Sequence, residues 1–119
     1  MKLLIVDDNT SVRRLIASIL SSRAHEIHEC ADGVDALTTY TALCPDFVLM
    51  DIAMKELDGI AATRQIVAAH PGARVIIVTD YDEAPLREAA LLAGACGYVL
   101  KEDLLEVDRL LEAYRDIRS

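Results

Sequence analysis

The chain has 119 residues, which excludes two domains because a typical domain needs about 100–150 residues. Hydrophobic residues make up 53% of the sequence, so the chain can bury a sizeable core and intrinsic disorder is excluded. Twelve Lys and Arg against 20 Asp and Glu give a formal net charge of −8, which repels nucleic acid phosphates and anionic membrane surfaces. We therefore expect no direct binding of nucleic acid or of a membrane by this chain.

The N-terminal apolar run, 1–6, meets Asp7 and Asp8 too early to be a signal sequence or a membrane span. A cytoplasmic location is expected. The three cysteines lack metal-site spacing and are expected to be free, buried thiols: Cys30, Cys44 and Cys96. The three histidines are expected at the surface: His25, His28 and His70.

The first half of the chain alternates apolar runs with amphipathic segments. A strand at 3–6 precedes a helix that begins near Asn9 and has apolar positions at helical spacing: Val12, Leu15, Ile16, Ile19 and Leu20. The second strand, 26–30, is polar except for Ile27, which suits the edge of a sheet. Asp32-Gly33 then turns into a second helix, stopped by Pro45, whose apolar residues are Val34, Leu37 and Leu43.

The second half continues the alternation. The third strand, 47–50, is apolar throughout, and the helix after it opens at Asp58-Gly59. The fourth strand, 74–79, contains four consecutive β-branched residues. Pro85 suits the first turn of the next helix, and Gly94 ends it. The fifth strand is 97–100, and the last helix carries an apolar stripe formed by Leu104, Val107, Leu111 and Tyr114.

Apolar strands separated by helices predict an α/β fold with a five-stranded parallel sheet and helices on both faces, a doubly wound three-layer sandwich. The strand order 2-1-3-4-5 is favoured, because it places the polar second strand at one edge and the most apolar strands inside. The whole chain, 1–119, is expected to form this one domain.

Polar residues follow the predicted strands at their carboxyl ends, where ligands bind in such sheets: Asp7, Asp8, Asp51, Thr79 and Lys101. Singly, each has a common alternative, since the aspartates can cap helices, the threonine can sit in a turn and the lysine can be solvated. Together they predict a site. Three close carboxylates need a cation, and hard oxygen ligands favour Mg²⁺ or Mn²⁺. The hydroxyl and ammonium groups can donate to phosphoryl oxygens, and a carboxylate can become an aspartyl phosphate.

Four motifs, LLIVDDN, PDFVLMDIAM with DG after it, VIIVTD and AGACGYVLK, resemble the receiver domain of two-component response regulators over essentially the whole chain. The resemblance implies a flavodoxin-like fold and a phosphorelay role, with a histidine kinase or phosphotransfer protein as partner. It implies that Asp51 is the phosphoacceptor. The other roles that it implies are metal binding by Asp7, Asp8, Asp51 itself and the backbone carbonyl of Ala53, phosphoryl binding by Lys101, and switching by Thr79 and Tyr98.

Three residues depart from the usual receiver pattern: Lys55, Asp80 and Glu102. Asp80 adds a carboxylate beside the site, which we expect to affect the rate of phosphorylation more than its occurrence. The GYVLK and LLIVDDN motifs look most like receivers that often precede a helix-turn-helix DNA-binding half. The chain is therefore interpreted either as a stand-alone receiver or as the receiver of a longer regulator.

The resemblance implies a signalling domain that promotes its own phosphorylation and dephosphorylation, rather than an enzyme. A Mg²⁺-dependent phosphohydrolase of the haloacid dehalogenase type is the main alternative, but the D-x-D motif of that class is missing. A flavin carrier is disfavoured because Asp7 and Asp8 would repel phosphate, and a pseudo-receiver because the full residue set is present. The segment 80–117 is predicted to be the surface for a partner or a second copy, with a solvated face as the alternative.

Overall fold

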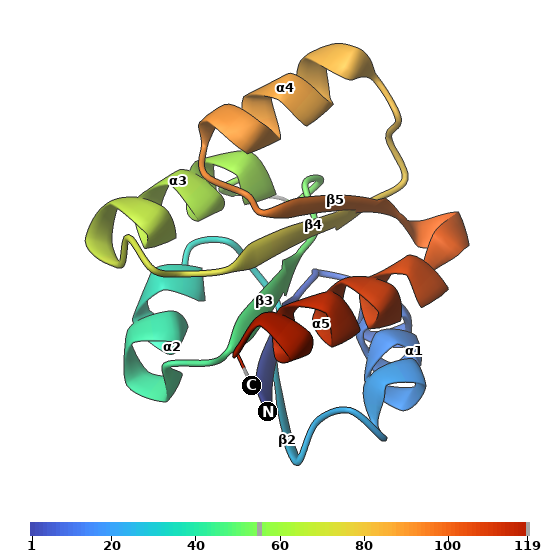
Figure 1. Ribbon diagram of the computed structural model, residues 1–119. Coiled ribbons are helices and arrows are strands. Elements are labelled where there is room, and N and C mark those ends of the chain that lie inside the picture. The colour runs from blue at the N-terminus through green and yellow to red at the C-terminus, as the bar shows by residue number, and fades with distance from the viewer. Residues whose placement is uncertain (55, 119) are drawn as a thin grey trace.

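The computed structural model describes residues 1–54 and 56–118, and within them five strands form one sheet in the order β2-β1-β3-β4-β5. Figure 1 shows the elements: β1 (Lys2–Val6), α1 (Thr10–Leu20), β2 (Glu26–Cys30), α2 (Ala36–Leu43), β3 (Phe47–Met50), α3 (Gly59–Ala69), β4 (Val75–Thr79), α4 (Ala84–Leu92), β5 (Gly97–Leu100), the short 3₁₀ helix η1 (Lys101–Asp103) and α5 (Leu105–Arg118). All four strand pairs are parallel. The predicted fold class and strand order are confirmed.

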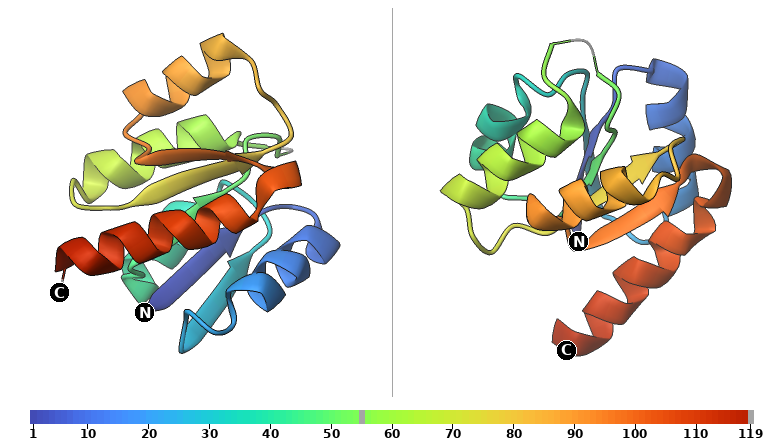
Figure 2. Two further views of the ribbon diagram at one scale, coloured as in Figure 1. Left: turned by 45° about the vertical axis from the view of Figure 1, so that its right-hand side comes forward. Right: turned by 90° about the horizontal axis from the view of Figure 1, so that it is seen from above.

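The sheet is the middle of three layers, as the views in Figures 1 and 2 show. Helices α1 and α5 cover one face of the sheet, and α2, α3 and α4 cover the other. Every residue of β3 and β4 is buried, whereas β2 at the edge is mostly half-buried, in keeping with its polar sequence.

Helix α4 buries a smaller side chain than α1 and α5 do. Large aliphatic residues of α1 and α5, including Ile16, Leu20 and Leu111, fill the core on their side of the sheet. Alanines are frequent on the opposite side, and Ala90 is the one residue of α4 that is buried. Arg23, just after α1, also forms ion pairs with Asp108 and Glu112 of α5.

The helix ends match the sequence signals. The Asn9 side chain accepts a hydrogen bond from the backbone N–H of Val12 at 3.1 Å, and Asp58 accepts one from Ala61 at 2.8 Å. Pro85 lies in the first turn of α4, where its missing N–H costs no helical hydrogen bond. Gly94, after α4, has a φ of 105°, a conformation that glycine adopts without strain.

Three predictions about burial are wrong. Leu15 is 52% exposed because each helical residue turns by about 100°, which places it beside the buried stripe rather than within it. Val34 is 50% exposed because α2 begins two residues later, so helical spacing does not apply to it. Cys44 is exposed because it caps α2 in the left-handed conformation; Cys30 is buried, Cys96 is half-buried, and all three thiols are free.

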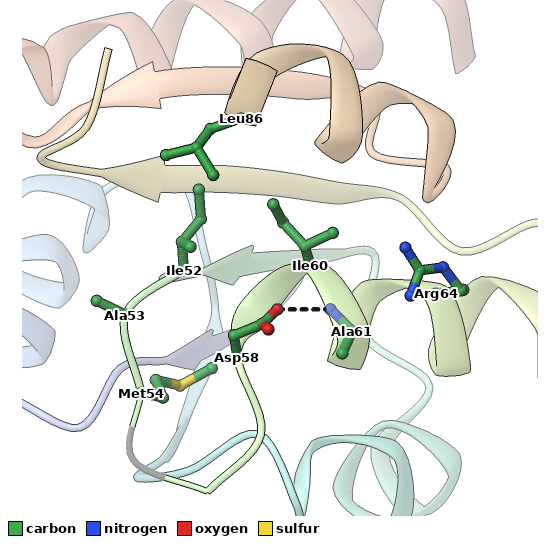
Figure 3. Close-up of a pocket in the computed structure, with 8 residues that line it drawn as sticks. All are labelled: Ile52, Ala53, Met54, Asp58, Ile60, Ala61, Arg64 and Leu86. Atoms are coloured by element: carbon green, nitrogen blue, oxygen red, sulfur yellow. Dashed lines mark hydrogen bonds between the residues drawn. The ribbon is translucent and has the colours of Figure 1, made fainter. Parts of the chain in front are cut away.

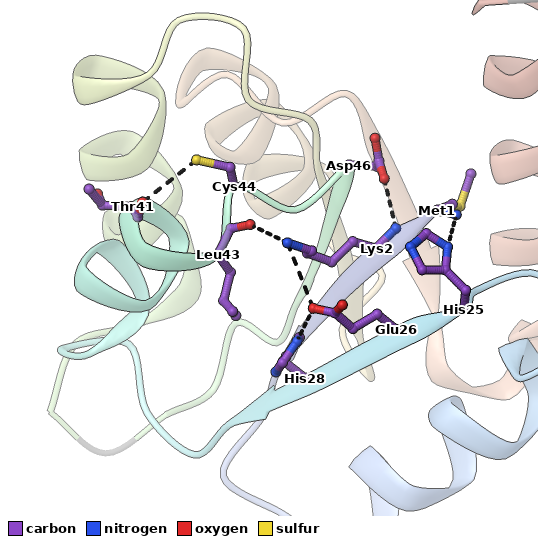
Figure 4. A network of polar contacts seen from close by, with 9 residues as sticks. All are labelled: Met1, Lys2, His25, Glu26, His28, Thr41, Leu43, Cys44 and Asp46. Atoms are coloured by element: carbon purple, nitrogen blue, oxygen red, sulfur yellow. Dashed lines mark hydrogen bonds and ion pairs between the residues drawn. The ribbon is translucent and has the colours of Figure 1, made fainter.

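The histidines are exposed or half-buried, as predicted. Figure 4 shows the polar contacts of two of them, His25 and His28. His28 lies 2.5 Å from the carboxylate of Glu26, whose pKa this contact lowers. His25 contacts the terminal amine of Met1, and His70 contacts Thr41. Among the helices of residues 1–54 and 56–118, none combines the length and apolar character that a membrane crossing requires.

Candidate functional site

An acidic cluster lies at the carboxyl ends of β1 and β3. One carboxylate oxygen from each of Asp7, Asp8 and Asp51 lies within 4.8 Å of the others. The strand register explains this, since Val6 of β1 pairs with Met50 of β3 and the next residue on each strand is an aspartate. Asp7 and Asp51 are buried, whereas Asp8 is exposed. The predicted meeting of these three residues is confirmed.

Backbone hydrogen bonds hold two of these aspartates at the sheet edge. The N–H of Asp51 donates to the carbonyl of Val6 at 2.9 Å, and the N–H of Asp7 donates to the carbonyl of Cys30 at 3.1 Å. The Asp7 carboxylate also accepts a hydrogen bond from the N–H of Asn9 at 2.8 Å. The positions of these carboxylates therefore follow from strand pairing and from the start of α1.

Lys101, the first residue after β5, reaches across to the cluster. Its Nζ atom lies 3.0 Å from Oδ2 of Asp7 and 3.3 Å from Oδ1 of Asp51. Burial alone would lower the pKa of Lys101, but the hydrogen bond to Asp7 and the charge of Asp51 outweigh it, and the pKa is raised. The ammonium group therefore stays charged between the two buried carboxylates.

The site has more negative than positive charge. The pKa of Asp51 is raised to about 6, first because the carboxyl is buried and then because Asp7 lies close by, while Lys101 partly offsets both effects. Three carboxylates that supply hard oxygen ligands, with one ammonium group beside them, fit a hydrated divalent cation such as Mg²⁺. A bound cation would offset the repulsion from Asp7, which is the second cause of this raised pKa.

Thr79 and Tyr98 both make a hydrogen bond to Tyr81. The Thr79 hydroxyl, buried at the end of β4, accepts a hydrogen bond from the N–H of Tyr81 at 3.3 Å. The Tyr98 hydroxyl donates to the Tyr81 carbonyl at 2.6 Å. The Arg87 guanidinium of α4 lies 4.6 Å from the centre of the Tyr98 ring and pairs with Asp82. The predicted switch residues are thus connected by the segment between β4 and α4.

Sequence analysis did not predict a pocket of about 300 Å³ whose lining includes Ile52 and Ala53, the two residues that follow Asp51 (Figure 3). The pocket lies between the loop that follows β3, the first turns of α3, and α4, and its lining is mainly apolar: Ile52, Ala53, Met54, Asp58, Ile60, Ala61, Arg64 and Leu86. Ala53 is an exposed residue of this loop, and Asp80 and Glu102 are exposed as well. Lys55, the remaining departure from the receiver pattern, lies outside the described residues.

An acidic cluster with two buried members, bridged by a lysine at the strand ends of a 2-1-3-4-5 parallel sheet, is typical of a class of α/β proteins that bind phosphoryl groups together with a cation. The model of the response regulator receiver domain matches residues 3–115, so the chain belongs to the response regulator receiver domain family. The function predicted from the sequence, a receiver domain of two-component signalling, is confirmed at this level.

Named relatives agree with this assignment. The chain is 36% identical over 114 residues to the chemotaxis protein CheY of Listeria monocytogenes, a match that covers 95% of this chain and 94% of CheY. It is 35% identical to the regulatory protein AtoC of Escherichia coli, but spans only 26% of the length of AtoC. Among solved structures, CheY in the CheX-CheY-BeF₃-Mg complex of Borrelia burgdorferi matches with a TM-score of 0.82 and 27% identity, over 96% of this chain and 89% of that one.

Proposed function

We propose that Asp51 is the phosphoacceptor of this receiver domain. The observation that carries the proposal is the position of Asp51, buried at the end of the central strand β3, within the acidic cluster and 3.3 Å from Lys101. Asp7 is already bound to Lys101 and to the backbone of Asn9, and Asp8 is exposed. Asp7 shares the burial and the contact with Lys101, but its carboxylate also accepts the N–H of Asn9, which leaves Asp51 the better nucleophile of the two buried carboxylates.

The transfer forms one bond and breaks one. An Asp51 carboxylate oxygen attacks the phosphorus atom of a phosphohistidine, a P–O bond forms, and the P–N bond breaks. The imidazole leaves with the bonding electron pair and takes up a proton. Lys101 and Thr79 then donate hydrogen bonds to the phosphoryl oxygens, and the hydroxyl of Thr79 must turn away from Tyr81 to do so.

The metal ligands that we propose are Asp8, Asp51 and the backbone carbonyl of Ala53, with Asp7 acting through a water molecule. When bound, Mg²⁺ neutralises the developing charge on the phosphoryl oxygens. The support comes from the clustered carboxylates and from the related CheX-CheY complex of Borrelia burgdorferi, which contains BeF₃ and Mg²⁺. A histidine kinase or phosphotransfer protein is the proposed phosphoryl source, in the cytoplasm.

The proposed output follows from the contacts around Tyr81. When Thr79 turns toward a phosphoryl group, the space that it leaves admits the Tyr98 ring, and the surface formed by residues 80–117 changes. That surface is the proposed contact for an output partner or a second copy. The proposed role is that of a signalling domain, as a separate protein or, as the match to AtoC allows, within a longer regulator.

The experiment is to incubate the protein with acetyl phosphate and Mg²⁺ and to weigh it by mass spectrometry. We expect one added phosphoryl group, no addition with EDTA, and no addition to Asp51→Asn. Asp35→Asn is the matched control, because Asp35 is exposed and its side chain does not cap α2. Unchanged labelling of Asp51→Asn would overturn the assignment, and release of inorganic phosphate from added phosphomonoesters would favour the phosphohydrolase alternative.

A further inference from the structure

Arg13 in the first turns of α1 contacts three different segments around the acidic cluster. Its Nη1 donates to the backbone carbonyl of Asp7 at 2.5 Å, its Nε to the carboxylate of Glu29 at 2.9 Å, and its Nη2 to the hydroxyl of Thr10 at 3.1 Å. The side chain is only 12% exposed. A planar guanidinium with three such contacts is fixed in orientation, because its donors have fixed directions.

Both backbone polar groups of Asp7, its N–H and its carbonyl, are linked to the end of β2. The N–H of Asp7 donates directly to the carbonyl of Cys30, and its carbonyl is joined to β2 through Arg13 and Glu29. That carbonyl belongs to the peptide group that leads to Asp8. The direction of the Asp8 side chain therefore depends on a peptide plane that Arg13 holds.

We infer that Arg13, supported by Glu29, is a positioning residue for the metal site and acts through the peptide group between Asp7 and Asp8. This inference rests on the proposed function, since it concerns the same cation. Asp7 is further fixed by Lys101 and Asn9. The effect of Arg13 therefore falls mainly on Asp8, the exposed member of the cluster.

Charge and positioning predict opposite results when Arg13 is neutralised. If Arg13 acted only as a nearby positive charge, Arg13→Gln would tighten Mg²⁺ binding, because a repulsion would be lost. If Arg13 acts by position, the same change weakens binding, by about tenfold, as is typical when the support of a metal ligand is removed. The sign of the change therefore separates the two roles.

The experiment measures Mg²⁺ binding to the folded protein by calorimetry. Arg13→Gln is compared with wild type and with Arg14→Gln, a matched control that removes the same charge from the exposed neighbouring residue. We expect about tenfold weaker binding for Arg13→Gln and a change of less than about twofold for Arg14→Gln. Arg13→Lys keeps the charge but loses the planar guanidinium, so we expect it to bind Mg²⁺ more weakly as well. It replaces Arg13→Gln in the test if that variant does not fold.

A second readout needs no metal. In EDTA, we expect faster amide hydrogen exchange at Asp8 and Asn9 in Arg13→Gln than in wild type, with Arg14→Gln unchanged. Wild-type or tighter Mg²⁺ binding by both Arg13 variants would overturn the inference while leaving the proposed function intact. No Mg²⁺ binding by wild-type protein would overturn both. Loss of thermal stability in EDTA with unchanged Mg²⁺ affinity would show a structural role alone and also overturn the inference.

Discussion

The charge of Asp51 is unfavourable in the metal-free protein. Burial and the neighbouring Asp7 both disfavour the carboxylate, and Lys101 offsets only part of this, so the pKa is raised to about 6 from an ordinary 3.8. For an acid, a raised pKa means that the folded state is stabilised while the group is protonated. That stability is present below pH 3.8, is lost as the pH rises through about 6, and is absent at neutral pH.

Replacing this carboxyl with an amide should therefore stabilise the metal-free protein. We expect Asp51→Asn to increase the free energy of unfolding in EDTA at pH 7.5 by on the order of 2–3 kcal/mol, and by almost nothing at pH 3.5. Urea denaturation at both pH values measures this, with Asp35→Asn as a control that changes an exposed carboxyl. An equal gain at both pH values would show that ionisation of Asp51 is not the cause.

At the scale of elements, the connection from β3 to α3 brings the start of α3 against the backbone of Asp51. The N–H of Gly59 donates to the carbonyl of Ile52 at 2.9 Å. A Cβ atom on Gly59 would lie 1.8 Å from the carbonyl oxygen of Asp51, whereas one on Gly72 would meet nothing within 4 Å. The first residue of α3 therefore has to be a glycine for the helix to approach the site this closely.

Gly59→Ala should be strongly destabilising, because backbone atoms rather than a flexible side chain would have to move. We expect a loss of roughly 3 kcal/mol of unfolding free energy, near the upper end for overpacked sites, together with weakened Mg²⁺ binding. Gly72→Ala is the matched control and should change neither quantity by much. Chemical denaturation and calorimetry measure both, and equal stability of the two variants would contradict the close approach.

Helix α4 is the element connected most directly to the switch residues. The Tyr98 hydroxyl is bound to the Tyr81 carbonyl, and Arg87 of α4 lies over the Tyr98 ring while pairing with Asp82. The half-buried ring packs against the core, and these polar contacts tie it to the segment between β4 and the first turns of α4.

Binding of beryllofluoride with Mg²⁺, an imitation of the phosphoryl group, should break these contacts. We expect the ring of Tyr98 to become more buried and the amides of residues 80–92 to change their hydrogen exchange, because Thr79 turns away from Tyr81. NMR of the tyrosine rings and of amide exchange measures this, with Tyr114 on the α5 side as an internal reference. Unchanged exchange throughout 80–100 would mean that Tyr98 is not a switch in this chain.

At the scale of the whole molecule, a second copy is one of the two proposed partners of the surface formed by residues 80–117. Three leucines in this region are exposed, Leu91, Leu92 and Leu105, and Leu92, at 84%, is the most exposed of them, so it is a suitable position at which to test contact with a second copy. We expect beryllofluoride to shift the protein from monomer to dimer in sedimentation experiments, and Leu92→Ser to weaken this shift. If the protein is a monomer both with and without beryllofluoride, a second copy is not the partner, and the surface would bind a different output protein.

The fold and most of the site were predictable because they depend on local signals. Strand ends fall directly before Asp7, Asp51 and Lys101, and parallel strand order then brings these residues together. Arg13 and the pocket in Figure 3 were not predictable, because both arise where segments distant in sequence meet at angles that no periodicity encodes. The prediction that Leu15 lies on the buried face of α1 was wrong for a related reason. The width of a buried stripe depends on what covers the helix, which the helical spacing does not give.

The unequal packing of the two faces has a consequence for how the molecule comes apart. The buried residues of α1 and α5 include Ile16, Leu20 and Leu111, whereas Ala90 is the one buried residue of α4, and the ion pairs of Arg23 add a link between the end of α1 and α5. Partial opening should therefore begin at α4, with α1 and α5 still attached to the sheet. A change at the carboxyl ends of the strands can therefore displace α4 while α1 and α5 stay packed on the opposite face of the sheet.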